Sequence, residues 1–206
     1  MDETALIRRA AGGDLEAFEA IVRLKRDRIV RIAWHIVGDR ELARDVAQEV
    51  FVRLYRVIGR FREGARFDTW LHRITLNLAI DALRRERPHR GHRPLEPDRT
   101  PGADFSAGGE IGSAEEGPAG SGPTAPGGPA ERLAAGEVRR IFIELSATLP
   151  PKQRIAFVLR EIEGLPTEEV AAVMKTTTST VRNHVLLARR SLQEALRRRY
   201  PEYCRS

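Results

Sequence analysis

The sequence predicts an all-α protein of two small helical domains joined by a long linker that is rich in proline and glycine. Apolar residues recur at helical spacing in two stretches, and no alternating strand pattern of useful length occurs. Within residues 88–130 lie 8 of the 12 prolines and 10 of the 17 glycines, a density that excludes a packed element. We therefore expect a first domain over residues 1–87, a flexible linker over 88–130 and a second domain over 131–206.

Three helices are expected in the first domain. They are marked by apolar residues at three- and four-residue steps: residues 14–38, residues 39 to a break that begins at Gly59, and residues 68–87. Aspartate is a favoured N-cap residue, and one stands at the start of each helix: Asp14, Asp39 and Asp68. Gly38 is the expected end of the first helix, because glycine adopts the left-handed conformation of a C-cap without strain.

The second domain is also expected to be helical. A helix opens near Glu131 and breaks at the Leu-Pro-Pro run of residues 149–151. The next helix runs to Glu163, with Gly164 as its C-cap.

A short helix from Pro166, a polar turn at residues 176–178 and a longer helix to about Arg199 then form a helix-turn-helix pattern. The apolar face of the longer helix is expected to pack inward: Val181, Val185, Ala188, Leu192 and Ala195. Its remaining surface carries the side chains that we expect to bind duplex DNA: Ser179, Thr180, Arg182, Asn183, His184, Leu186, Leu187 and Arg190.

The residue types on this surface suit a major groove. Asn183 can pair with adenine and Arg182 with guanine, each through two hydrogen bonds. The helix N-terminus can bind a phosphate through its free N–H groups, and Leu186 and Leu187 can contact thymine methyl groups. The alternatives are that one leucine covers a neighbouring helix, or that the whole helix pair is only structural.

Net charge follows the same division of the chain. The whole chain carries +6, the first domain +4, the second +5 and the linker −3. A basic protein of this kind suits a polyanionic partner, although an ordinary basic protein would show the same balance. The acidic linker either keeps a tether solvated or mimics nucleic acid in a basic channel.

Two candidate sites lie in the first domain. Asp45, Gln48 and Glu49 share one exposed helix face that suits a basic protein partner, unless it is a solvated face with local salt bridges. Aromatic residues then interleave with arginines, which is typical of single-stranded DNA binding: Phe61, Phe67 and Trp70 with Arg60, Arg62, Arg66 and Arg73, followed by Arg84 and Arg85. Taken singly, Phe61 and Trp70 are more often core residues than stacking platforms.

Four segments in order resemble the extracytoplasmic-function (ECF) sigma factors of bacterial RNA polymerase: DVAQEVFVRLYR (45–56), RFREGARFDTWLHRITLNLAIDALRR (60–85), LPPKQRIAFVLREIEGLPTEEVAAVM (149–174) and STVRNHVLLARRSL (179–192). The resemblance covers about residues 14–87 and 131–197. It implies a transcription initiation factor that directs core RNA polymerase to promoters and that an anti-sigma factor holds inactive.

The resemblance also assigns roles to residues. Asp45, Gln48, Glu49 and Phe51 match the motif that binds core polymerase. Residues 61–85 match the part that opens the promoter near minus ten and captures a flipped base of the non-template strand, with Asn77 at the base pocket and Trp70 and Arg73 nearby. The second domain is expected to bind the minus-thirty-five element.

The match is incomplete on the minus-thirty-five helix. Ser179 stands where the family often has glycine, Asn183-His184 replace a Ser-Arg pair, and Leu186-Leu187 replace a frequent aromatic-arginine pair. We therefore expect an unusual minus-thirty-five sequence.

Other classes of protein are disfavoured. The five histidines and the single cysteine, Cys204, show no metal-ligand or nucleophile–base spacing, so neither catalysis, a metal nor a cofactor is expected. The N-terminal residues lack the apolar core of a signal peptide, and no apolar run reaches the length of a membrane span, which predicts a cytoplasmic protein without membrane insertion. The main alternative is a helix-turn-helix regulator that is not a polymerase subunit.

Overall fold

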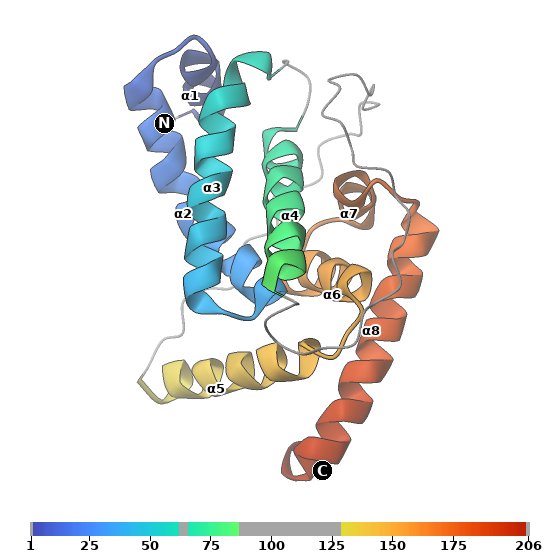
Figure 1. The fold of residues 1–206 in the computed structure, drawn as a ribbon. Coiled ribbons are helices and arrows are strands. Elements are labelled where there is room, and N and C mark those ends of the chain that lie inside the picture. The colour runs from blue at the N-terminus through green and yellow to red at the C-terminus, as the bar shows by residue number, and fades with distance from the viewer. Residues whose placement is uncertain (1, 62–65, 87–128, 205–206) are drawn as a thin grey trace.

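The computed structural model describes residues 2–61, 66–86 and 129–204, and every regular element in these ranges is helical (Figure 1). The all-α prediction is therefore confirmed. The α-helices are α1 (Glu3–Ala11), α2 (Leu15–Val37), α3 (Arg40–Val57), α4 (Phe67–Glu86), α5 (Pro129–Ser146), α6 (Pro151–Phe157), α7 (Thr167–Met174) and α8 (Thr178–Arg199). Short turns of other helix types follow three of them: η1 (Ile58–Arg60), the π-helical turn η3 (Val158–Ile162) and η4 (Pro201–Cys204).

The boundaries of α2 and α3 follow from the predicted caps. The Asp14 carboxylate accepts the backbone N–H of Ala17 at 3.0 Å, and Asp39 accepts that of Leu42 at 2.9 Å. Each aspartate thus satisfies one of the backbone donors that a helix start leaves unpaired. Gly38 ends α2 at φ 81°, in the left-handed region that glycine adopts without strain.

Two features of the first domain differ from the prediction. The helix α1 was not expected; Asp2 caps it, and Leu6, Ile7 and Ala10 bury its inner face. Asp68 is not the cap of α4, because the helix already begins at Phe67 and Asp68 lies in its first turn.

The second domain begins with α5 at Pro129, so the last two residues of the predicted linker are helical; the rest of that linker, up to residue 128, lies outside the described residues. The Leu-Pro-Pro break comes between α5 and α6, as predicted, and Pro151 is the first residue of α6. The helix that was predicted to continue to Glu163 changes at Val158 into a π-helical turn, and Gly164 follows at φ 70°.

The two domains pack against one another rather than lying apart. In Figure 1, α7 lies beside α4, and α6 lies near the lower end of α2. The interior of the first domain is formed by fully buried aliphatic residues of α2, α3 and α4, among them Ile21, Ile32, Leu54 and Leu71. Buried apolar residues of α6 and α7 join the same cluster, so one continuous core stabilises both domains. Each buried side chain of this size contributes about 1.5–3 kcal/mol.

Candidate protein and nucleic-acid interfaces

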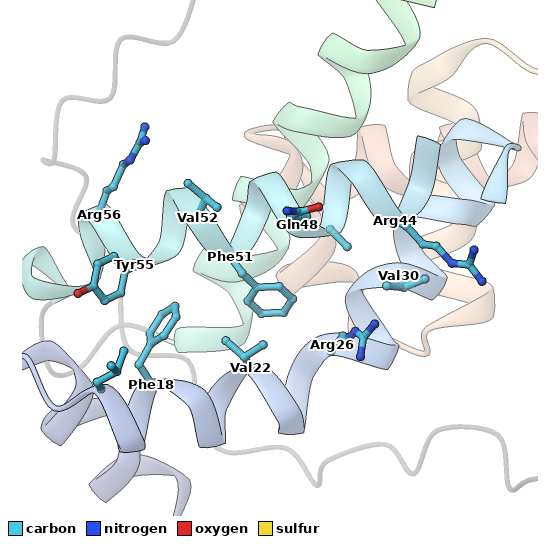
Figure 2. Close-up of a pocket in the computed structure, with 12 residues that line it drawn as sticks. Phe18, Val22, Arg26, Val30, Arg44, Gln48, Phe51, Val52, Tyr55 and Arg56 are labelled. Atoms are coloured by element: carbon cyan, nitrogen blue, oxygen red, sulfur yellow. The ribbon is translucent and has the colours of Figure 1, made fainter. Parts of the chain in front are cut away.

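A groove of about 730 Å³ runs between α2 and α3 on the face away from the second domain (Figure 2). Its apolar lining comes from both helices: Leu15, Phe18, Val22, Val30, Ala47, Phe51, Val52 and Tyr55. Three arginines complete the lining: Arg26, Arg44 and Arg56. An apolar cleft bordered by cations suits an amphipathic helix that carries acidic residues beside its apolar face.

Several groove residues are exposed although they are apolar. Leu15 is 57% exposed, Val52 45% and Tyr55 59%, while the Tyr55 ring packs edge-on against Phe18 with 5.1 Å between centroids. Exposed apolar side chains gathered in one cleft, rather than scattered singly, indicate a protein-binding surface.

The residues predicted to bind a protein partner divide between this groove and its edge. Gln48 and Phe51 line the groove, with Gln48 exposed and Phe51 9% exposed. Asp45 and Glu49 are exposed on the same helix but are not part of the lining. Glu49 lies 3.6 Å from Arg85 of α4, an exposed pair that is worth little in water. Three of the four predicted residues are therefore exposed on α3, while the Phe51 ring is largely buried at the floor of the groove.

The three predicted aromatic residues at the start of α4 form one cluster. The centroids of Phe61 and Phe67 are 5.4 Å apart, those of Phe61 and Trp70 are 5.4 Å apart, and those of Phe67 and Trp70 are 6.1 Å apart. Phe67 is only 6% exposed, whereas Phe61 and Trp70 are half-buried. In this arrangement Phe67 supports the cluster from below, and Phe61 and Trp70 are the rings that retain an accessible face.

The polar residues predicted for single-stranded DNA continue from this cluster along one side of α4. Trp70, Arg73, Asn77 and Arg84 follow at steps of three, four and seven residues, which places them above one another on a helix. Asn77 and Arg84 are exposed and Arg73 is half-buried; Arg85 is also exposed, on the adjoining side. The arrangement offers aromatic faces at one end and cations further along, as a single strand requires.

The helix-turn-helix is formed by α7, a tight turn and α8. Lys175 turns the chain in the left-handed conformation at φ 52°. Thr177 then caps α8 by accepting the backbone N–H of Thr180 at 3.1 Å. The buried face of α8 contains Val181, Val185 and Ala188, as predicted, while Leu192 and Ala195 are half-buried.

The predicted duplex-binding surface of α8 is open to solvent. Ser179, Arg182, Asn183 and Arg190 are exposed, Thr180 is half-buried, and Leu186 and Leu187 are 47% and 36% exposed. The two leucines are therefore not used to cover a neighbouring helix in this structure. They are available for contact with apolar atoms of a partner.

His184 differs from the rest of the set. Its Nδ1 atom is buried without a hydrogen-bond partner, and burial, followed by the nearby charge of Lys152, lowers its pKa. The imidazole is therefore neutral at pH 7 and supplies no positive charge for a phosphate.

Sequence reasoning missed most of the groove between α2 and α3. Its signal was present: Val52 and Tyr55 interrupt the polar face of α3 with apolar side chains. Their significance depends on which face of α2 lies opposite, and that is known only from the fold.

The described residues contain no group of three or more His, Cys, Asp or Glu side chains that could hold a metal ion. Within the same residues, the structure has no helix long and apolar enough to span a bilayer.

Two family models match the chain in the order expected. Sigma-70 region 2 matches residues 21–89, which include most of the groove lining and all of α4. Sigma-70 region 4 matches residues 139–192, which include α7 and most of α8. The chain is 33% identical over 192 residues to the RNA polymerase sigma-H factor of Pseudomonas aeruginosa, covering 93% of this chain and 92% of that protein. It is 29% identical over 194 residues to the ECF RNA polymerase sigma-E factor of Escherichia coli, covering 93% of each.

Solved structures share the fold. CnrH in complex with the cytosolic domain of CnrY matches with a TM-score of 0.65 and 22% identity, over 96% of this chain and 99% of that one. The sigma factor RpoE in complex with the anti-sigma factor NepR, from Bartonella quintana, matches with a TM-score of 0.60 and 21% identity, over 89% and 98%.

The chain belongs to the sigma factors of bacterial RNA polymerase, the non-enzymatic initiation factors that take part in promoter recognition. Within them it is of the ECF type, as the resemblance implied.

Proposed function

We propose that this chain binds core RNA polymerase through α3 and the groove beside it, holds the unpaired non-template strand on α4, and reads the minus-thirty-five duplex with α8. The observation that supports this most strongly is the order of the two sigma-70 matches, each of which falls on a surface of suitable chemistry. The polymerase-binding residues are Asp45, Gln48, Glu49 and Phe51, joined by Val52 and Tyr55 of the groove.

The single-strand site consists of residues on and before α4: Phe61, Phe67, Trp70, Arg73, Asn77, Arg84 and Arg85. Flipping a base out of the stack costs a few kcal/mol, which stacking and hydrogen bonds to the flipped base must offset. Phe61 and Trp70 supply the accessible rings, and Asn77 supplies an exposed amide on the same side of the helix.

The duplex site consists of the open surface of α8: Ser179, Thr180, Arg182, Asn183, His184, Leu186, Leu187 and Arg190. Arg182 and Asn183 are adjacent and exposed near the helix N-terminus, where side chains reach the base edges in a helix-turn-helix. The neutral imidazole of His184 and the two exposed leucines favour base contacts over phosphate contacts at their positions.

We propose in addition that the chain acts in the cytoplasm, has no catalytic activity of its own, and is controlled by an anti-sigma factor. We also propose that its working units are residues 1–87 and 131–206, joined by residues 88–130. The family matches, which begin and end within or close to these units, support this division.

The test is run-off transcription with purified core RNA polymerase and a genomic promoter library. The full chain is expected to support initiation from a set of promoters with shared upstream elements. A Gln48→Ala/Glu49→Ala variant is expected to lose co-purification with core polymerase, whereas Glu41→Ala, an exposed change in the first turn of the same helix, is expected to retain it.

A helix-turn-helix regulator would give the opposite pattern, namely binding to duplex DNA without co-purification of core polymerase. That result, or full retention of polymerase binding by the Gln48→Ala/Glu49→Ala variant, would remove the proposal.

A further inference from the structure

Glu163 joins the two domains through a buried ionic contact. It follows the π-helical turn of the second domain, and its side chain is 2% exposed. Arg31 of α2 donates to both carboxylate oxygens, from Nε at 2.9 Å and from a terminal nitrogen at 3.0 Å. Arg28 of α2 adds a third hydrogen bond, from Nε at 3.2 Å.

The carboxylate of Glu163 is ionised in this position. Burial by itself would raise its pKa, but the hydrogen bonds and charges of Arg31 and Arg28 hold the pKa below its usual value. A buried carboxylate that loses such partners is strongly destabilised. Because both arginines belong to the first domain and Glu163 to the second, this ionic contact exists only while the domains are together.

Glu169 makes a second contact between the domains. It lies in the first turn of α7 with a side chain that is 4% exposed. Thr69 of α4 donates its hydroxyl to this carboxylate at 3.0 Å, and Arg66 lies 3.3 Å from it.

The local backbone places Glu163 in the interface. Its own N–H bonds to the carbonyl of Val158 at 2.9 Å, five residues back, which is the π-helical pattern rather than the α-helical one. Gly164 then turns the chain away in the left-handed conformation. π-Turns are rare and concentrate at functional positions, because they displace one side chain from the regular helical register.

Closure affects the two candidate DNA surfaces differently. Arg66 is one of the arginines that interleave with the aromatic residues, and it is paired with Glu169. Thr69, in the first turn of α4, is only 3% exposed. Closure therefore buries Thr69 and pairs Arg66 at the start of α4, while the surface of α8 that carries Arg182 and Asn183 stays open.

The closed form also cannot span the two promoter elements, a conclusion that rests on the proposed function. The minus-ten and minus-thirty-five elements lie about 25 base pairs apart, or roughly 85 Å of duplex. While the two domains are held together by one apolar core and by the buried carboxylates of Glu163 and Glu169, they cannot bind the minus-ten and minus-thirty-five elements at the same time.

We propose that Glu163 holds the free chain in a closed form that is inactive on promoters, without the help of any partner protein. Its carboxylate bridges Arg28 and Arg31, and breaking this bridge shifts the equilibrium toward separated domains. Only the open form can then bind both promoter elements at once, and any partner that favours the closed form acts on an equilibrium that the chain already possesses.

The test measures the separation of the domains in the full-length chain by energy transfer between two dyes. One dye is attached to Cys204, the single native cysteine, and the other to a cysteine introduced at the exposed position 16 by Glu16→Cys. Glu163→Gln is expected to raise the ratio of open to closed molecules by roughly 10- to 100-fold, since it leaves two arginines without their buried charge partner.

Glu161→Gln is the matched control. Glu161 belongs to the same π-helical turn and is also ion-paired, but its partner is Arg189 of the same domain. This variant is expected to show the energy transfer of the wild-type chain. A second opening variant, Arg28→Gln/Arg31→Gln, removes the bridge from the other side and serves if Glu163→Gln does not fold by circular dichroism.

Binding to a minus-ten non-template oligonucleotide provides the second readout. The opened variants are expected to bind it at least about tenfold more tightly than the wild type and the Glu161→Gln variant, by fluorescence anisotropy. Wild-type energy transfer in folded Glu163→Gln would overturn the proposal. The sigma-factor assignment is tested separately, because transcription could fail while the change in energy transfer is still observed.

Discussion

The two buried histidines make the stability of this chain fall as the pH is lowered. His35 is 4% exposed and His72 is 2% exposed, and each has an Nδ1 atom without a hydrogen-bond partner. Burial is the largest cause that lowers the pKa of both side chains to about 4. The opposing effect of the Glu163 carboxylate is outweighed in each case.

The direction of the effect follows from which state binds the proton. The unfolded chain protonates its histidines near their ordinary pKa of 6.5, while the folded chain resists protonation down to about pH 4. Protons are therefore taken up preferentially by the unfolded state, and folding stability is lost as the pH falls through this window. At pH 4.5 the loss amounts to about 2–2.5 kcal/mol for each histidine, or about 4–5 kcal/mol for both.

Two nearby carboxylates act in a lower range. Asp68 and Glu163 both have pKa values below the ordinary one. Burial, the largest single influence, would raise them, but the hydrogen bond from Lys25 to Asp68 and those from Arg31 to Glu163, with the neighbouring positive charges, lower them by more. Their contribution is present above their ordinary pKa and is lost below it, at about pH 4 and under. Between pH 6.5 and 4.5 the change in stability therefore comes mainly from the two histidines.

Urea unfolding followed by circular dichroism at several pH values between 7 and 4.5 measures this loss. A total of 4–5 kcal/mol approaches the whole stability of many domains of this size. The double variant His35→Phe/His72→Leu removes both titrating groups, and its stability is expected to be nearly constant over the same range. If the wild type were equally constant, or the variant equally sensitive, burial of these histidines would not be the cause.

Three further outcomes can be measured independently. Arg182→Ala is expected to weaken binding to the minus-thirty-five element by about 1–3 kcal/mol in a footprint titration, and unchanged binding would exclude a base contact. Tyr55→Glu places a charge in the apolar groove and is expected to weaken binding to core polymerase at least about tenfold in a competition assay, without affecting binding of the duplex element. Gly164→Ala is expected to lower the stability of the second domain by about 1 kcal/mol in thermal unfolding, because a φ of 70° strains any residue that has a Cβ. The loss is limited to this strain, since nothing lies within 4 Å of the added Cβ.

Local signals in the sequence predicted most of the fold. Asp14 and Asp39 were identified as caps because a short acidic side chain before an apolar repeat has few other local uses. Asp68 looks the same in sequence but lies inside its helix and pairs with Lys25 at 2.7 Å. Local pattern does not distinguish a cap from an acidic residue of the first turn.

Other features depend on contacts that no local pattern contains. The helix α1 has nine residues and too few apolar positions to show a clear repeat. The π-helical turn before Glu163 preserves the apolar content of an ordinary helix, so periodicity gives no sign of it. The partners of Glu163 lie 132 and 135 positions earlier in the chain, and helical spacing does not predict pairs so distant.

The candidate surfaces were predicted as residue sets rather than as shapes. The exposed positions on α8 followed from the angle of 100° between successive helical residues, and the structure agrees on which side of that helix is buried. The groove beside α3 needed the opposite wall, which α2 provides. Phe67 could not be separated from Phe61 and Trp70 without knowing which ring faces inward.

The end of α2 is completed by a side chain from the other half of the protein. The carbonyl of Ile36 lies in the last turn of α2, where backbone carbonyls have no partner within the helix. Arg154 of α6, 118 residues later in the chain, donates a hydrogen bond to it at 2.8 Å. During synthesis the first half leaves the ribosome well before Arg154 exists, so this carbonyl is first bonded to water. The exchange of water for arginine at this carbonyl is therefore a late step of folding, which waits for the second half of the chain.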